Sequence, residues 1–183
     1  MKLFNKMSEK SLFQTYKTTL YFILKFVGIY LLLVLLYNLY LSQFQGTTDS
    51  FTIFTGKMVS KLFGLIGMDA QTLPLEIESG LKLMINGNYV ARIIEGCTAM
   101  SVIIMFVAFI ISFGNRLKQS LIFALAGALL IYVFNLFRIV FLGVILYRLP
   151  QYQDVAHRIV FPAMIYGFVV LLWLIFIKKQ KNV

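Results

Sequence analysis

Residues 120–147 read SLIFALAGALLIYVFNLFRIVFLGVILY and contain a single charged residue, Arg138. This apolar run is longer than the roughly 20 residues that a helix needs to cross a bilayer. Three further apolar runs cover residues 20–41, 98–113 and 159–177. The chain of 183 residues is 60% hydrophobic and 13% charged, whereas soluble domains are about half apolar and a quarter charged. We predict an all-α integral membrane protein, a single domain over residues 1–183 with a bundle of four transmembrane helices.

The charge distribution predicts how these helices are oriented. The amino-terminal tail, the 114–119 loop and the carboxyl tail together hold nine basic residues and one acidic residue, while segments 42–97 and 148–158 hold six of each. Because short cytoplasmic segments are enriched in Lys and Arg, both termini are expected inside the cell and the 42–97 segment outside. We assign the basic pI of about 9.8 to this asymmetry and expect no nucleic-acid partner.

The extracytoplasmic segment 42–97 shows two local patterns. Apolar residues recur every three or four positions over 51–65, which predicts an amphipathic helix at the membrane surface; they are Phe51, Phe54, Met58, Leu62 and Leu65. Alternation over 73–78 predicts a strand, and the runs 81–85 and 88–94 flank Asn86-Gly87, which predicts a β-hairpin. This meander leads into Cys97, where it either positions a substrate over the thiol or forms a solvated cap.

Three chemically active residues are predicted to meet at the outer membrane face. Cys97 is the only cysteine and begins the second apolar run, so it cannot form an intrachain disulfide. Arg138 lies eighteen residues after Ser120, about 27 Å up the third helix, and His157, the only histidine, precedes the fourth. A thiolate nucleophile, an imidazole acid/base and a cation for the oxyanion together predict acyl transfer through a thioester.

Each of these residues also has a plain structural interpretation. A lone membrane cysteine is ordinarily a packing residue, and an arginine near a helix end often reaches to lipid headgroups. Asn135, one turn before Arg138, favours a polar seam instead. One Cys and one His without ligand spacing make a zinc site improbable, and we expect no cofactor. The alternative function is a non-enzymatic four-helix membrane assembly or scaffold protein; a transporter is disfavoured because the polar groups gather at one face.

Three short stretches carry a family resemblance: Glu95-Gly96-Cys97-Thr98-Ala99, residues 135–139 (NLFRI), and His157 before the last span. Over about residues 94–177 the chain resembles the exosortase and archaeosortase family of membrane cysteine transpeptidases. It is most similar to exosortase F, a compact branch associated with Bacteroidetes. The resemblance implies that Cys97 is the nucleophile, Arg138 the substrate or transition-state cation and His157 the acid/base.

The same resemblance bears on the surroundings of the site. We expect Asn135, Glu95 and Thr98 to support it. The family usually has glycine two residues after the cysteine, whereas this chain has Ala99, which adds only a methyl group and is expected to keep the close approach of helices there.

The resemblance further implies a substrate class and a location. The partners would be exported proteins with a carboxyl-terminal sorting signal, made of a short motif, one transmembrane helix and a basic cluster. The enzyme would sit among lipids in the bacterial inner membrane, cleave the signal on the outer face and transfer the protein to an acceptor nucleophile that the sequence does not identify.

Overall fold

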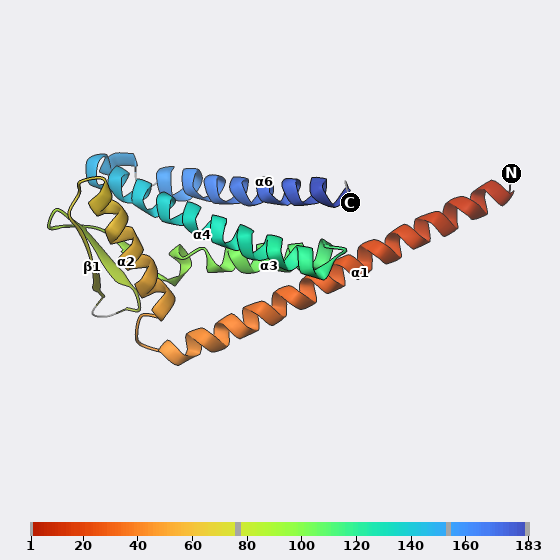
Figure 1. Ribbon diagram of the computed structural model, residues 1–183, viewed down its shortest axis with the longest axis horizontal. Helices are drawn as coiled ribbons and strands as arrows, with labels where there is room; N and C mark the ends of the chain where they lie inside the picture. The colour runs from red at the N-terminus through yellow and green to blue at the C-terminus, as the bar shows by residue number, and fades with distance from the viewer. Residues whose placement is uncertain (1, 76–77, 153–154, 182–183) are drawn as a thin grey trace.

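The computed structural model describes the backbone of residues 2–75, 78–152 and 155–181, and the side chains of residues 16–75, 78–152, 155 and 158–179. Two long elements, α1 (Lys2–Leu41) and α4 (Leu117–Arg148), extend along the molecule in Figure 1. The remaining elements are η1 (Ser42–Phe44), α2 (Ser50–Leu65), β1 (Ala70–Pro74), β2 (Leu81–Ile85), β3 (Asn88–Ile93), η2 (Glu95–Cys97), α3 (Met100–Phe113), η3 (Pro150–Tyr152), η4 (Ala156–Val160) and α6 (Phe161–Lys181).

Three helical segments are long and apolar enough to cross a membrane: Tyr16–Phe44, Leu117–Arg148 and Arg158–Lys179. The predicted helical membrane protein is therefore confirmed. The predicted span over 98–113 is an apolar helix, α3, of only 14 residues, so a fourth crossing stays a prediction. Figure 1 shows that α3 carries the chain from the sheet end of the molecule to the opposite end, from which α4 returns.

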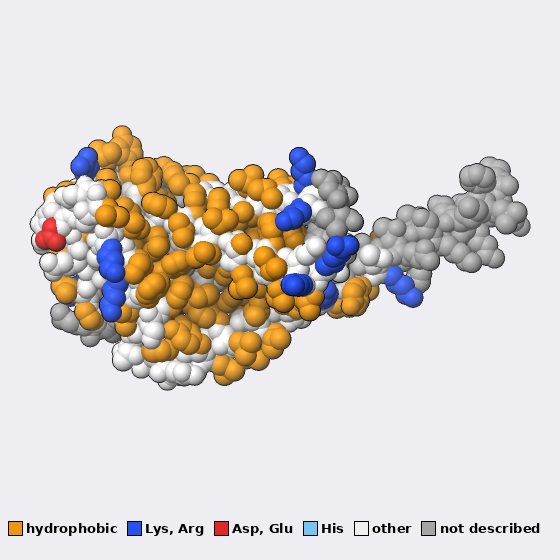
Figure 2. Space-filling view, in the orientation of Figure 1, with side chains coloured by type: hydrophobic (Ala, Val, Ile, Leu, Met, Phe, Trp, Pro, Cys, Tyr) orange, Lys and Arg blue, Asp and Glu red, His pale blue; other side chains and the backbone are white. Residues whose placement is uncertain are grey.

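Aromatic side chains hold the bundle together. On α1, Phe22 makes edge contacts with Phe109 and Phe113 of α3, with ring centroids 5.9 Å apart in both pairs. A separate core joins α3, α4 and α6, and its central members Phe106 and Ile131 are fully buried. Figure 2 shows hydrophobic side chains over the flank of the bundle and Lys and Arg at its two ends, as expected for a surface in contact with lipid.

The predicted amphipathic helix is confirmed as α2. It begins after Asp49, whose carboxylate accepts hydrogen bonds from the backbone N–H groups of Phe51 and Thr52 at 3.0 Å each. Its fully buried residues Val59 and Phe63 pack against the sheet and α4. The predicted apolar stripe borders this face: Met58 and Leu62 pack partly against the same core, whereas Phe54 and Leu65 are exposed.

The predicted hairpin is also confirmed, with Asn86 and Gly87 both at positive φ between β2 and β3. The strand predicted over 73–78 is wrong in its bounds. The observed strand β1 pairs with β2 from Ala70↔Ile85 to Pro74↔Leu81, and Glu76 and Ile77 lie outside the described residues. This three-stranded antiparallel sheet, in the order β1-β2-β3, ends directly before the segment that carries Cys97.

Candidate active site

Cys97 lies in a single 3-10 turn, η2, between the sheet and α3. The turn is closed by a hydrogen bond from the Cys97 backbone N–H to the Ile94 carbonyl at 2.8 Å. The expectation that Cys97 begins the second apolar helix is wrong, because α3 starts at Met100 and Ala99 is its N-cap residue. The thiol therefore gains less from the α3 dipole, which acts mainly within the first turn of a helix.

Ala99 adopts the left-handed conformation, with φ 59° and ψ 14°. This conformation costs a residue with a Cβ roughly 1–2 kcal/mol, and glycine adopts it freely. The sequence predicts that the methyl group of Ala99 still permits close helix approach. The structure shows a different constraint at this position, namely the backbone reversal that connects η2 to α3, which glycine would adopt without strain.

Asn135 fixes the position of the Cys97 backbone. Its side chain is fully buried in α4, and its amide Nδ2 donates a hydrogen bond to the Cys97 carbonyl at 2.8 Å. The predicted polar seam on α4 therefore exists and connects that helix to the cysteine-bearing turn. The other amide atom, Oδ1, is buried without a hydrogen-bond partner among the described residues.

Arg138 follows Asn135 by one turn of α4 and is half-buried. Its guanidinium carbon lies 5.9 Å from the centre of the Phe161 ring at the start of α6. Cys97 and Tyr166 lie within electrostatic range of this guanidinium. Its Nε–H is buried and has no acceptor within the described part of the chain. A buried guanidinium donor without a partner is available to an incoming oxygen atom.

Cys97 and Arg138 line one cavity of about 380 Å³. The remaining lining comes from β2, β3 and the stretch of α4 after Arg138; it comprises Leu83, Tyr89, Val90, Ala91, Arg92, Ile93, Ile139, Leu142, Gly143 and Leu146. The volume is within the range of ordinary ligand pockets, roughly 300–1,000 Å³. The cavity therefore combines a sulfur nucleophile, a fixed cation and room for part of a substrate.

His157 lies in η4, a five-residue π-helix just before α6. Its side chain is outside the described residues, so its predicted role stays a prediction. Two observations concern its surroundings. Phe161, which contacts Arg138, follows it by four residues, and Figure 1 shows the start of α6 at the same end of the bundle as the sheet.

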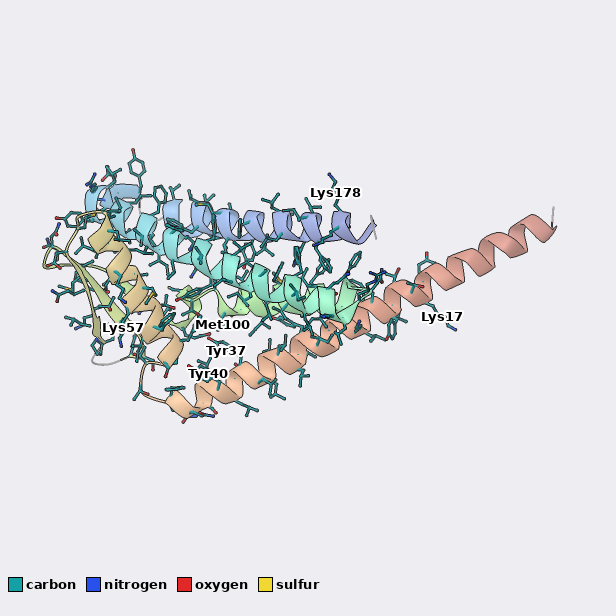
Figure 3. All side chains as sticks on the ribbon, in the orientation of Figure 1. Lys17, Tyr37, Tyr40, Lys57, Met100 and Lys178 are labelled. Atoms are coloured by element: carbon teal, nitrogen blue, oxygen red, sulfur yellow. The ribbon has the colours of Figure 1, made fainter. Side chains whose placement is uncertain are left out.

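Glu95 and Thr98 were predicted to support the site. Glu95 is the first residue of η2 and Thr98 follows its last residue; both lie near α1, and neither lines the cavity. The Thr98 hydroxyl is buried and donates to the Glu95 backbone carbonyl at 2.7 Å. The Tyr37 hydroxyl of α1 is buried beside the Glu95 carboxylate and the Thr98 hydroxyl, without a hydrogen bond of standard geometry. Figure 3 labels Tyr37 on α1 and Met100 at the start of α3.

The sequence did not single out the β3 residues that line the cavity, among them Arg92. The available signal was the Asn86-Gly87 hairpin, whose second strand ends only four residues before Cys97. No group of three His, Cys, Asp or Glu side chains in the described part of the chain is placed to hold a metal ion.

Comparison with known proteins gives one match. The family model described as transmembrane exosortase (Exosortase_EpsH) matches residues 15–178, which includes Cys97, Arg138 and His157. No curated protein and no solved structure matched the chain. With most of its length covered by this model, the chain belongs to the transmembrane exosortase family.

Proposed function

We propose that this chain is a cysteine transpeptidase that cleaves the carboxyl-terminal sorting signal of exported proteins at the outer membrane face. The observation that carries the proposal is the cavity shared by Cys97 and Arg138. Family membership supports the general activity, and the layout of the site supports the assignment of these two residues. The closer likeness to exosortase F belongs to the same proposal.

In the proposed reaction, the Cys97 Sγ attacks the carbonyl carbon of the scissile peptide bond as its proton passes to His157. The C–S bond forms, and the electron pair of the carbonyl moves to oxygen, which Arg138 stabilises. Collapse of this intermediate breaks the C–N bond, and His157 returns the proton to the departing amine. An acceptor nucleophile then attacks the thioester, releases the Cys97 thiol and completes the transfer.

The predicted orientation places this cavity outside the cell. Three basic segments support it: Lys17 lies on the amino-terminal part of α1, Arg116 and Lys118 lie at the α3–α4 turn, and Lys178 and Lys179 lie near the end of α6. Figures 1 and 2 show the α3–α4 turn and the end of α6 at the end of the bundle opposite the sheet, with Lys and Arg side chains gathered there.

The direct test is the replacement Cys97→Ala in cells that export a tagged protein with such a signal. The variant is expected to accumulate in the membrane like the wild type while the tagged precursor stays uncleaved. Cys97→Ser is the matched control, because it keeps the size and polarity of the side chain but replaces the thiol by a far weaker nucleophile. Normal processing in Cys97→Ala would refute the proposal.

The alternative, a non-enzymatic scaffold, is favoured by one observation: Cys97 packs against the core formed by α2, the sheet and α4. The two functions differ in thiol reactivity. A membrane-impermeant maleimide applied to spheroplasts labels an activated thiol in an open cavity quickly and a packed thiol slowly. Labelling no faster than that of the denatured protein at the same pH would favour the scaffold.

A further inference from the structure

The cavity that contains Cys97 follows one edge of the sheet. Five consecutive residues of β3, from Tyr89 to Ile93, line it. Side chains of a strand alternate between its two faces, so a cavity over one face would contact alternate residues only. A lining of five consecutive residues therefore includes the backbone of β3 as well as side chains, and Leu83 of β2 adds one residue from the neighbouring strand.

This edge has no strand beside it in the described structure. The sheet order is β1-β2-β3, so one side of β3 pairs with β2 and the other side is the end of the sheet. No backbone hydrogen bond from another described segment reaches β3 on that side. An unpaired strand edge offers a row of N–H and C=O groups to any extended chain that lies beside it.

A β-bulge shapes the strand at this point. Leu83 pairs with Ala91 and Met84 pairs with Tyr89, which leaves Val90 between them without a partner on β2. Bulges bend a strand and are common next to active sites, where they redirect backbone and side chains. The bulged residue is itself part of the cavity wall.

The charges of the cavity suit a peptide backbone. The lining contains two guanidinium groups, Arg92 and Arg138, and no carboxylate. Arg92 makes an ion pair with Glu78 at 2.8 Å, but both side chains are more than half exposed, so this pair contributes little and exchanges readily. Carbonyl oxygens and acidic side chains of a bound segment would therefore find cationic donors in this groove.

Building on the proposed function, we propose that an extended segment of the exported substrate binds as an added strand along the free edge of β3 and delivers its scissile carbonyl to Cys97. Strand addition of this kind takes affinity from backbone hydrogen bonds. At about 3.3 Å per residue, the five lining residues of β3 match four or five substrate residues.

The direction of the added strand follows from the topology. β3 runs toward η2 and the bundle, with Cys97 four residues beyond its end. The substrate of the proposed reaction enters the membrane after its scissile bond. The residues before that bond therefore run in the same direction as β3, so the pairing is parallel, with the earlier substrate residues beside Tyr89 and the later ones beside Arg92.

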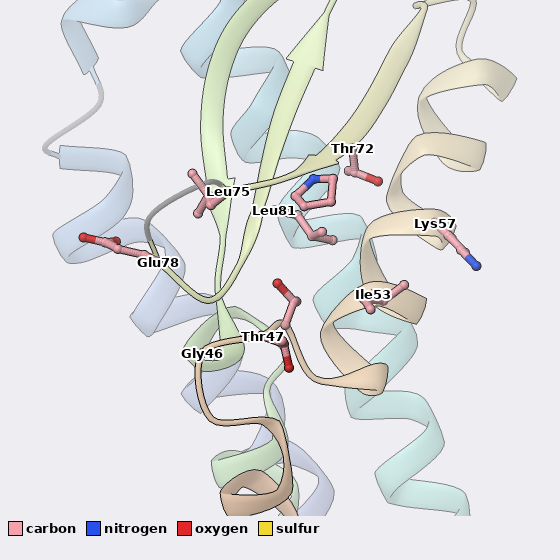
Figure 4. Close-up of a pocket in the computed structure, with 10 residues that line it drawn as sticks. Gly46, Thr47, Ile53, Lys57, Thr72, Leu75, Glu78 and Leu81 are labelled. Carbon is pink, nitrogen blue, oxygen red and sulfur yellow. The ribbon is translucent and has the colours of Figure 1, made fainter.

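The larger cavity of the sheet region offers an internal comparison. It measures about 440 Å³ and lies toward the β1 edge, where Figure 4 shows Thr72 of β1, Ile53 of α2 and Thr47 before α2 around it. Cys97 and Arg138 are not in its lining, so it provides no nucleophile. A cysteine introduced on β1 therefore detects contacts between the substrate and the sheet that do not involve the Cys97 cavity.

The test uses disulfide crosslinking of the full-length protein. In the Cys97→Ala background the chain has no other thiol, so single cysteines are introduced by Tyr89→Cys and Arg92→Cys on β3 and by Leu73→Cys on β1 as the matched control. Tyr89 and Leu73 are both exposed, at 57% and 47%. The probe is a tagged exported reporter whose tail contains a polar segment, one apolar helix and a basic cluster. Single cysteines are scanned through the eight positions before its cleavage site.

Crosslinks from Tyr89→Cys are expected at every second reporter position, with a maximum about three residues earlier than that from Arg92→Cys. Leu73→Cys should give at least about tenfold less product. Crosslinks every three or four positions, a reversed order of the two maxima, or equal yields from β1 would overturn the proposal. The proposal would also be overturned if the variants gave no crosslinks although they elute from a size-exclusion column at the same volume as the parent protein. In that case lipid would be the occupant of the groove.

The two proposals fail in different ways. If the reporter is cleaved normally in the Cys97→Ala background, the proposed function is wrong. If the reporter stays uncleaved but is not captured on β3, the transpeptidase assignment holds and the strand-addition mode is wrong.

Discussion

The hydrogen bond between Asn135 and the Cys97 carbonyl gives the sharpest test of how the site is held. Asn135→Leu keeps nearly the same volume but removes the donor at 2.8 Å. The Cys97 carbonyl then loses the one hydrogen bond found for it among the described residues. A lost neutral hydrogen bond costs about 1 kcal/mol, and leaving a buried partner unpaired costs up to about 3 kcal/mol.

Part of this loss of stability is offset, because the leucine also removes the buried, unpaired Oδ1 atom of Asn135. The net destabilisation is therefore about 1–2 kcal/mol, which for a chain of this size lowers Tm by roughly 2–8 °C. The functional loss should be larger than the loss of stability. A displacement of the nucleophile by about 1 Å costs roughly 100-fold in rate.

Two measurements separate these effects: thermal unfolding in detergent, which gives Tm, and the rate of reporter cleavage at a temperature well below Tm. Asn38→Leu provides the matched control, since it makes the same chemical change at an exposed position of α1 and should shift stability by less than about 0.5 kcal/mol. If Asn135→Leu unfolds and cleaves like Asn38→Leu, the hydrogen bond does not position Cys97 and the reasoning fails.

Three further tests address other parts of the structure. Arg138→Lys replaces the planar guanidinium and should lower the cleavage rate by about 100- to 1,000-fold at unchanged membrane accumulation. A wild-type cleavage rate in this variant would show that Arg138 takes no part in the reaction. Ala99→Gly should be tolerated. Ala99→Val places a β-branched residue at φ 59° and should lower both Tm and membrane accumulation. Equal Tm values for the two variants would contradict the argument that the left-handed conformation of residue 99 is strained. An added methyl group at Gly127 would overlap the Phe106 ring, so Gly127→Ala should lower the free energy of unfolding by about 1–3 kcal/mol, measured by thermal unfolding. Gly167→Ala is the control and should be neutral, because an added methyl group there has no neighbour within 4 Å. Similar unfolding free energies for the two variants would refute close packing between α3 and α4.

The elements that the sequence predicted well are those fixed by local patterns. Long apolar runs specify α1, α4 and α6 because only a helix satisfies backbone polar groups in lipid. The β2–β3 turn was equally predictable, since Asn86 and Gly87 both adopt the positive φ that such two-residue turns require. The position of β1 was not predictable from alternation, because its register depends on close packing of Thr72 and Leu81 against Gly56 of α2.

The candidate site shows the same division. The rise of a helix predicted that Arg138 lies near the depth of Cys97, and in the structure both residues line one cavity. The left-handed Ala99, the 3-10 turn and the bulge at Val90 follow from contacts between segments far apart in the chain, such as Asn135 with Cys97. Spacing along the sequence does not encode such contacts.

The short length of α3 has a consequence for the depth at which the proposed reaction would occur. Its 14 residues advance about 21 Å, whereas the hydrocarbon layer is about 30 Å thick. If α3 is the predicted crossing, the two leaflets must draw together around it or admit water at its ends. The sulfur would then work at the depth of the lipid ester groups, and acyl-chain length would become a control on turnover: bilayers of short-chain lipids should support faster cleavage than those of long-chain lipids.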